Sequence, residues 1–455
     1  MDAGMKVQSS VDPLRYPTLT EHGQRILRFM REHPAAPIYR NKSGNRLMAA
    51  EVTELQLFEK KNINAAINCF PDKKPSWLDN FLAHVFTQVP YYRGLGRSSS
   101  LRFEDLPTVS RADFASDITR FVPDSVTLDR LIQFSTTGTT GHPLRVPSHP
   151  VVAGRYLTFH KRALKRFGIE LQYGRGQVGV VLVGYQRRCF TYVSVTPTMD
   201  ESGLAKINLH PDDWRDPADR VCYLEALAPE IITGDPLSLT ELARLSLKTR
   251  PRALLSVSMA LSEGLRQMLE KRFECPVLDI YSLNEVGPVA VLDPKLQGHV
   301  LLQPQLYVEI LDPQGKPLQS GERGEITVTG GFNFCLPLLR YRTGDYASLS
   351  TDGEEPILIG LAGRPPVRFR TKTGEWINNI EITHALKLLP LAQYGFHQLA
   401  DGSCVLRLHA MSMHLASCAR QALIPLFGND AISLELLIAQ DKIIQYSSDL
   451  EQASV

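Results

Sequence analysis

Apolar residues along this chain follow two patterns: helical spacing, and short continuous runs. The change from the first to the second marks where predicted helices give way to predicted strands. Between residues 77 and 89 the apolar residues return every three or four positions, and the run stops at Pro90. This spacing predicts a helix that buries one face. Two earlier segments, 25–30 and 52–60, also look helical, and neither carries visible chemistry.

Farther along the chain, short continuous apolar runs replace the helical spacing. Such runs are typical of strands buried on both faces of a parallel sheet. The predicted strands are 178–184, 230–233, 253–257 and 277–281. Helices are expected at 237–247 and 262–273, and this alternation indicates an α/β architecture. Residues 297–349 read instead as strands joined by Gly/Pro turns.

Composition narrows the class of protein. The 455 residues include 50 Lys+Arg and 48 Asp+Glu, so a net charge of +2 argues against nucleic acid as a partner. No apolar run reaches the roughly 18 residues that span a bilayer, and residues 1–20 lack a hydrophobic signal core. Seven cysteines without a C-x-x-C pair read as reduced packing residues. We therefore expect a cytoplasmic protein with a small-molecule substrate and no membrane partner.

A run of hydroxyl and glycine residues, 135–141, follows a short predicted strand at 131–134 and leads into His142 and Pro143. Glycines let a backbone approach a ligand closely, and N–H and hydroxyl groups can donate to phosphate oxygens. No Lys follows Gly141, which excludes the P-loop of NTPases. The run predicts a site for nucleotide phosphates; a plain surface turn is the alternative.

Polar residues also follow the predicted strands. They occur at 234–236, 258–260 and 281–285. In α/β sheets, ligands bind outside the carboxyl ends of the strands, which is where these residues fall. For 281–285 the alternative is a buried Tyr at a strand end beside a helix-capping Glu.

The run at 135–143 resembles the [ST]-[ST]-G-T-T-G-x-P signature of adenylate-forming enzymes, in particular their phenylacetate–CoA ligase-like branch. Other strings of that branch occur in the same order. They are residues 88–93, 105–107, 110–113, the Y-G-x-[ST]-E-like string 281–285, the R-Y-x-T-G-D string 340–345, and Gly363-Arg364. Ser282 and Asn284 depart from the Y-G-x-[ST]-E pattern.

The resemblance implies a fold and a division into domains. It implies an α/β protein with a large adenylate-forming domain over residues 76–363, built from mixed sheets with flanking helices and a β-rich subdomain. A small α+β domain would follow at 364–455. Residues 1–75 form an N-terminal extension of unknown role. Pro365 and Pro366 stand where the family places a flexible hinge, so they are expected to restrict rotation of the small domain.

The resemblance also implies roles for single residues. Tyr281 would stack on adenine, Glu285 would hold Mg²⁺, and Asp345 with Arg364 would bind the ribose. Lys442 would stabilise charge during catalysis, with Glu285 and Thr139, although a solvated surface lysine is an equal alternative. The nucleotide-binding set is Ser135, Thr136, Thr137, Gly138, Thr139, Thr140, Gly141, Ala260, Tyr281, Ser282, Asp345 and Arg364. The expected acyl-binding set is Tyr185, Phe190, Tyr192, Asp235, Gly287 and Pro288.

The implied activity is ATP-dependent activation of a carboxylic acid through an acyl-adenylate, followed by thioester formation. By analogy the acid is aryl or arylacetic, and the cofactors are ATP, Mg²⁺ and coenzyme A. Two alternatives stay open: transfer of the acyl group to a carrier-protein thiol or an amine, and a catalytically weak relative that binds nucleotide. The resemblance also leaves a homodimer open.

Overall fold

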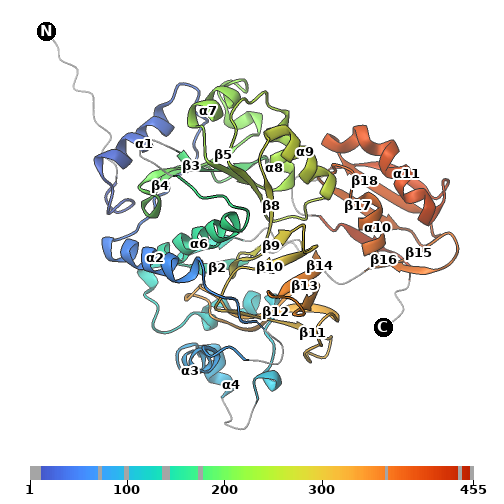
Figure 1. Cartoon of the computed structure of the whole chain (residues 1–455), viewed down its shortest axis with the longest axis horizontal. Coiled ribbons are helices and arrows are strands. Elements are labelled where there is room, and N and C mark those ends of the chain that lie inside the picture. Colours follow the sequence, from blue (N-terminus) through green and yellow to red (C-terminus); the bar gives the residue numbers. More distant parts are fainter. Residues whose placement is uncertain are drawn as a thin grey trace.

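A computed structural model gives the structure of residues 12–69, 74–96, 102–135, 144–172, 178–363, 367–438 and 443–450, to which every structural statement below refers. Figure 1 shows a broad body built around one long sheet and a smaller C-terminal lobe at its side. The helices are α1 Glu21–Glu32, α2 Ala49–Asn62, α3 Leu78–Gln88, α4 Pro90–Leu95, α5 Arg111–Ser116, α6 Pro150–Arg166, α7 Asp219–Leu227, α8 Pro236–Arg244, α9 Glu263–Phe273, α10 Asn379–Leu386 and α11 Ala416–Phe427.

The body contains a 12-stranded sheet in the order β11-β12-β13-β14-β10-β9-β8-β7-β6-β3-β5-β4. Strands β5, β3, β6, β7 and β8 run parallel, and the remaining pairs in the sheet are antiparallel. The parallel half with β4 comprises β3 Val178–Gly184, β4 Tyr192–Thr196, β5 Ser202–Asn208, β6 Ile231–Gly234, β7 Ala253–Ser256 and β8 Val277–Leu283. The antiparallel half comprises β9 Gly287–Asp293, β10 Gly298–Leu301, β11 Leu306–Leu311, β12 Arg323–Gly330, β13 Leu338–Ser350 and β14 Ile357–Gly363.

This sheet confirms the predicted α/β architecture with mixed strands. The predicted strands at 178–184, 230–233, 253–257 and 277–281 correspond to β3, β6, β7 and β8. Helix α8 ends at Arg244, earlier than the predicted 247, because Leu245 already has the extended backbone angles φ −72° and ψ 141°. The apolar leucines beyond α8 still pack into the core, which explains why the pattern continues past the helix.

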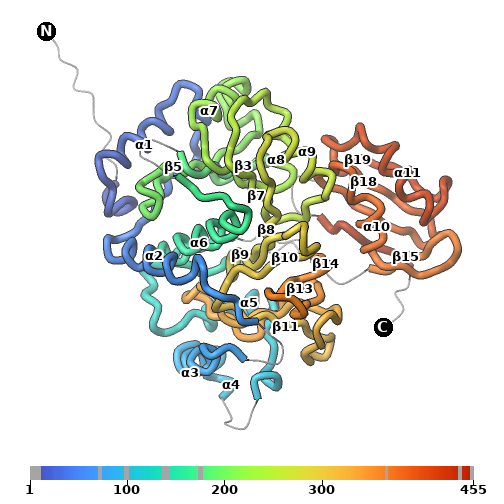
Figure 2. The backbone as a smooth tube through the Cα atoms, in the orientation of Figure 1, coloured from blue at the N-terminus to red at the C-terminus, as the bar shows by residue number. Residues whose placement is uncertain are grey.

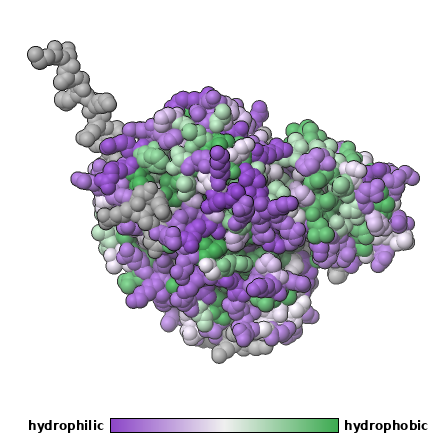
Figure 3. Space-filling view, turned by 45° about the horizontal axis from the view of Figure 1, so that its top comes forward, coloured by the Kyte–Doolittle hydropathy of each residue, from purple (hydrophilic) through white to green (hydrophobic). Residues whose placement is uncertain are grey.

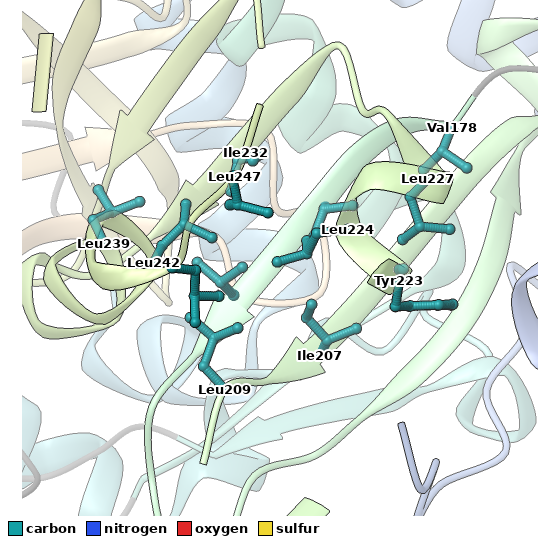
Figure 4. Packing of buried hydrophobic residues seen from close by; sticks show 14 of the residues in the cluster. Val178, Ile207, Leu209, Tyr223, Leu224, Leu227, Ile232, Leu239, Leu242 and Leu247 are labelled. Carbon is teal, nitrogen blue, oxygen red and sulfur yellow. The ribbon is translucent and has the colours of Figure 1, made fainter. Parts of the chain in front are cut away.

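Helices α1, α7, α8 and α9 pack on one face of the parallel half. Figure 4 shows Leu224 and Leu227 of α7 and Leu242 of α8 gathered over Ile207 of β5. The opposite face is covered by α6, whose Phe159 packs against the strands there, and α2 lies alongside α6. The sheet is therefore a middle layer between two layers of helices.

The N-terminal segment packs against the far edge of the sheet. Figures 1 and 2 show α1 beside β4 and β5. The carboxylate of Glu201 accepts hydrogen bonds from the N–H groups of Thr20 (3.0 Å) and Gly23 (3.2 Å) at the start of α1. Tyr16 donates from its hydroxyl to the carbonyl oxygen of Val193 over 3.1 Å. The sequence leaves the role of residues 1–75 open, and the structure shows that residues 12–62 contribute to the core of the body.

The antiparallel half has its own core, against which α3 packs. The predicted helix at 77–89 is α3, and Pro90 begins α4, where a missing N–H costs nothing. The phenol of Tyr92 accepts a hydrogen bond from the N–H of Leu339, 3.2 Å away. A separate hairpin pairs β1 Ile132–Ser135 with β2 Arg145–Ser148.

Residues 367–438 and 443–450 form a C-terminal lobe with a separate hydrophobic core. Its strands are β15 Arg368–Arg370, β16 Trp376–Asn378, β17 Tyr394–Gln398, β18 Cys404–His409, β19 Ile432–Leu437 and β20 Tyr446–Ser448. The lobe contacts the body at the start of α9, where the N–H of Gly264 donates to Lys387 O over 2.8 Å. In Figure 3, hydrophobic residues gather on the lobe, whereas the body surface is mostly hydrophilic. The domain boundaries predicted from the sequence stay predictions.

Candidate active site

A tyrosine and an aspartate meet at the junction of the two halves of the sheet. The phenol of Tyr281, on β8, donates to Oδ2 of Asp345, on β13, over 2.8 Å. Burial raises the pKa of Tyr281 well above its usual value, and the neighbouring Asp345 carboxylate adds to the shift. Tyr281 therefore stays protonated and keeps one oxygen of Asp345 in place.

The chain around Asp345 is held in a fixed irregular turn of the strand. Gly344 has a φ of +78°, a backbone angle that favours glycine. Its N–H donates to Glu325 Oε1 over 3.0 Å. Thr343 Oγ1 accepts from the N–H of Asp345 (3.1 Å) and donates to Ile326 O (2.8 Å). The T-G-D string thus sets the direction of the Asp345 side chain through local bonds.

Glu285 lies in the turn between β8 and β9 and is 5% exposed. Tyr341 donates from its hydroxyl to Glu285 Oε1 over 3.1 Å, and Nη1 of Arg111 lies 4.0 Å from the same oxygen. Burial raises the pKa of Tyr341 well above its usual value, and Glu285 adds to the shift. The amide of Asn333 fixes the backbone by donating to Glu285 O over 3.2 Å.

The carboxylate of Glu285 is suited to one kind of metal. Its second oxygen, Oε2, accepts no hydrogen bond from any residue that the structure describes. Mg²⁺ in nucleotide sites is typically bound by one or two carboxylates together with phosphates and water. Among the described residues, no group of three or more His, Cys, Asp or Glu could hold a metal alone. Glu285 therefore fits Mg²⁺ that arrives with a nucleotide and does not fit an all-protein metal cage.

Arg111 is a candidate site residue that the sequence patterns do not reveal. In the sequence it belongs only to the string 110–113, without an assigned role. Its position depends on long-range pairing, because Val109 donates to Arg340 O (3.0 Å) and accepts from Arg342 N (2.8 Å). The ring of Phe114 also stacks on Tyr341, 4.9 Å between centroids. The residues around Val109 do not predict its pairing with β13. The one sequence feature that could have marked Arg111 is that a basic residue occurs in a string similar to the family's.

Arg340, the first residue of the R-Y-x-T-G-D string, has a structural position. It is 1% exposed, and its guanidinium lies 3.3 Å from Glu309. It also donates to the carbonyl oxygens of Glu104 (2.5 Å) and Leu106 (2.7 Å). Arg340 therefore ties the segment before Arg111 to β13.

Among the acyl-binding candidates, three aromatic residues make ring contacts and Asp235 caps a helix. Phe190 is 51% exposed, with its ring 5.5 Å from that of Tyr192, and Tyr185 lies 5.9 Å from the ring of His210. Asp235 caps α8 by accepting from the N–H and the hydroxyl of Ser238, both at 2.9 Å. Burial raises the pKa of Asp235, and those hydrogen bonds oppose the shift.

Gly287 and Pro288 lie in tightly packed surroundings. A Cβ on Gly287, whose φ is +77°, would lie 2.4 Å from the ring of Phe332. The backbone oxygen of Pro288 accepts from the amide of Gln303 over 2.7 Å.

Two residues depart from the Y-G-x-[ST]-E pattern. The backbone oxygen of Asn284 accepts a hydrogen bond from the phenol of Tyr156 over 3.0 Å. Ser282 is partly buried within β8.

Several predicted residues lie outside the part of the chain that the structure describes. They are Thr136, Thr137, Gly138, Thr139, Thr140, Gly141, Arg364, Pro365, Pro366 and Lys442. Ser135 is exposed at the end of β1, the predicted strand at 131–134, and pairs with Arg145. Ala260 is exposed after β7. The site roles given from the sequence all stay predictions.

Comparison with known proteins finds similarity to AMP-binding enzymes. A family model described as "AMP-binding enzyme" matches residues 187–334. The phenylacetate-coenzyme A ligase of Escherichia coli (strain K12) is 36% identical over 92 residues, 19% of this chain and 21% of the relative. The phenylacetate-coenzyme A ligase of Thermus thermophilus is 24% identical over 299 residues, 60% of this chain and 64% of the relative. The first curated relatives are thus matched over only about a fifth of their own length.

Among solved structures, a 2-hydroxyisobutyryl-CoA ligase in the postadenylation state superimposes with a TM-score of 0.60 at 18% identity. The match covers 82% of this chain and 88% of that one. This likeness shows the fold. The motifs, the family-model match and the relatives together make the chain similar to AMP-binding enzymes and, among them, to phenylacetate–CoA ligases.

Proposed function

We propose that this protein is an acid–CoA ligase that activates a carboxylic acid with ATP. The observation that carries the proposal is the junction of the two half-sheets, where the Tyr281–Asp345 pair lies beside Glu285. Asp345 offers a carboxylate for ribose hydroxyls, and Glu285 offers one for Mg²⁺. Glu285 follows the carboxyl end of the parallel strand β8, the kind of position where α/β sheets bind ligands, and Asp345 contacts Tyr281 of the same strand.

The proposed reaction has two steps. A carboxylate oxygen of the acid attacks the α-phosphorus of ATP, and pyrophosphate leaves with the electrons of the broken P–O bond. The sulfur of coenzyme A then attacks the acyl carbon, loses its proton, and AMP leaves. The attacking carboxylate is already ionised at neutral pH, so the first step needs no general base. Mg²⁺ bound at Glu285 would offset negative charge on the phosphates.

The chain's own residues would bind and orient the reactants. Arg111, 4.0 Å from Glu285, supplies a second positive group on the side where phosphates would bind. Lys442 and residues 136–141 are proposed to act on the phosphates as the family resemblance implies. Phe190 and Tyr192 offer aromatic surface for an aryl or arylacetic acid, in keeping with the names of the curated relatives.

Pyrophosphate release in the presence of ATP, Mg²⁺ and a panel of aryl acids tests the first step. Activity that disappears in Glu285→Gln and Asp345→Ala supports the proposal, and no release with any acid refutes it. Supplying coenzyme A or a carrier protein to the active mixture then identifies the acceptor. Nucleotide binding without pyrophosphate release would indicate the weak nucleotide-binding relative instead.

A further inference from the structure

A partly exposed patch lies on the sheet face that α6 covers. Lys206 on β5 stands between its cross-strand partners Leu182 on β3 and Tyr192 on β4. All three side chains are only partly buried, whereas the neighbouring Val181 and Ala205 on the other face are fully buried. With Phe190, whose ring contacts Tyr192, these residues form what we call the Lys206 patch. It is aromatic and aliphatic, with a single ammonium.

The ammonium of Lys206 has no hydrogen bond or ion pair with any residue that the structure describes. Its charge acts on Cys189, which lies beside the carboxyl end of β3. The Cys189 sulfur would be 3.0 Å from a Cβ at Gly184, the last residue of that strand. Burial raises the pKa of the Cys189 thiol, and Lys206 opposes that shift. The positive charge therefore lies toward the ligand-binding edge of the sheet.

The carboxylates near Cys189 are committed to other partners. Asp213 accepts from Nε of Arg40 over 2.5 Å and from the amide of Asn208 over 2.7 Å. Asp235 is occupied by Ser238. Neither carboxylate bonds to Lys206. A lysine kept on an apolar patch without a partner among these groups is suited to a ligand that brings its own negative charge.

The position of the patch also limits the length of that ligand. From β8, which carries Tyr281, the strand order runs through β7, β6 and β3 to β5. Four strand spacings of about 4.8 Å amount to roughly 19 Å. Tyr281 points to the opposite face, because Leu278 and Ile280 of β8 pack on the α6 face, so the ligand would pass over the carboxyl ends of the strands. The roughly 19 Å is therefore a lower bound, which an adenylate extended by an elongated acid would have to reach. A short acid would leave the Lys206 patch empty.

We propose that Lys206 binds a second acidic group of the substrate, so that the protein selects elongated aryl acids carrying a second carboxylate. This rests on the proposed function. The first carboxylate of such an acid is activated at the nucleotide, its ring lies on Tyr192 and Phe190, and the second carboxylate accepts a hydrogen bond from Lys206. A hydrogen bond between charged groups corresponds to about 10- to 100-fold in kcat/KM.

The test compares acids of matched shape. Phenylacetate, 4-methylphenylacetate and 4-carboxyphenylacetate are each offered with ATP, Mg²⁺ and coenzyme A, and kcat/KM is measured from pyrophosphate release. We expect the diacid to exceed both monoacids by at least about tenfold. In Lys206→Met and Lys206→Gln, the diacid should lose about 10- to 100-fold while the monoacids change little. Lys271→Met, on the exposed side of α9, is the matched control and should leave all three values unchanged.

A binding measurement keeps the inference separate from the proposed function. In a background of Cys222→Ser and Cys418→Ser, which removes the exposed thiols of the described chain, maleimide labelling of Cys189 is followed. The diacid should slow labelling in the parent but not in Lys206→Met. Pyrophosphate release from monoacids without any preference for the diacid overturns the inference and leaves the proposed function intact. Diacid protection of Cys189 without pyrophosphate release retains the inference as a binding site and refutes the ligase.

Discussion

The contact between α9 and the C-terminal lobe predicts the effect of one added methyl group. A Cβ on Gly264 would lie 2.2 Å from Leu388 O and 2.6 Å from the backbone carbon of Leu389. Both neighbours are backbone atoms, which cannot turn aside as a flexible side chain can. Normal carbon contacts are about 3.5–4.0 Å, so Gly264→Ala should force the lobe away from the body by about 1 Å or more.

The free energy at stake follows from the contacts that such a shift would break. Two donors are involved: Gly264 N donates to Lys387 O over 2.8 Å, and the one hydroxyl proton of Ser262 is shared between the carbonyl oxygens of Leu389 (3.1 Å) and Leu391 (3.3 Å). Each hydrogen bond contributes about 1 kcal/mol, and overpacking costs about 1–3 kcal/mol. A total of about 3–5 kcal/mol would lower the docked population by at least about 100-fold.

The same substitution should stabilise α9 itself. Alanine in a helix is favoured over glycine by roughly 0.5–1 kcal/mol, so the body should melt no earlier than in the parent. We expect X-ray scattering to show a larger radius of gyration and calorimetry to show the lobe unfolding separately. Gly353→Ala is the control, because a Cβ added at that glycine would have no atom within 4 Å. Unchanged scattering together with one unchanged transition would refute the reasoning.

Three further substitutions test the site and the body. Asp345→Ala should reduce ATP affinity without unfolding the protein, at a cost of about 1–3 kcal/mol in stability because Tyr281 loses its acceptor; equal affinity by calorimetry contradicts this. Tyr341→Phe removes the hydrogen bond to Glu285 and should raise the Mg²⁺ concentration needed for ATP binding, by about tenfold for a bond to a charged group; an unchanged Mg²⁺ titration contradicts it. Burial lowers the pKa of His160 to about 4, so the unfolded chain binds the extra proton first as pH falls below about 6.5. The parent should therefore lose about 2–3 kcal/mol more than His160→Gln between pH 7 and 4.5 in urea unfolding, and equal losses would contradict the assignment.

The sequence predicts those features that depend on neighbouring residues. The buried strands are visible because both faces of β3 and β6 are covered, which leaves a continuous apolar run. The T-G-D string is visible because its turn is held by its own residues and by Glu325 on the next strand. Features that depend on contacts between residues far apart in the sequence cannot be predicted from local patterns. Arg111 reaches Glu285 only because Val109 pairs with β13, and no pattern near Arg111 encodes that pairing.

Within one sequence motif, neighbouring residues can have different roles, some in packing and some at the site. Within R-Y-x-T-G-D, Arg340 is buried against Glu309 while Asp345 lies partly exposed at the site. Asp235 belongs to the predicted acyl-binding set, and its visible bonds are those of a helix cap. A one-letter pattern cannot separate a packing role from a binding role, because both require the same side chain.

The docking of α1 has a consequence for synthesis on the ribosome. The groups that fix this helix, Val193 and Glu201, follow their partners Tyr16 and Thr20 by 177 and 181 residues. At translation rates of about 5–20 residues per second, α1 waits roughly 10–40 s before its binding surface exists. During that time its apolar stripe, Ile26, Leu27 and Met30, is exposed on the nascent chain and is a natural target for chaperones. The first helix of the described chain therefore cannot reach its final place until the chain has been made past residue 201.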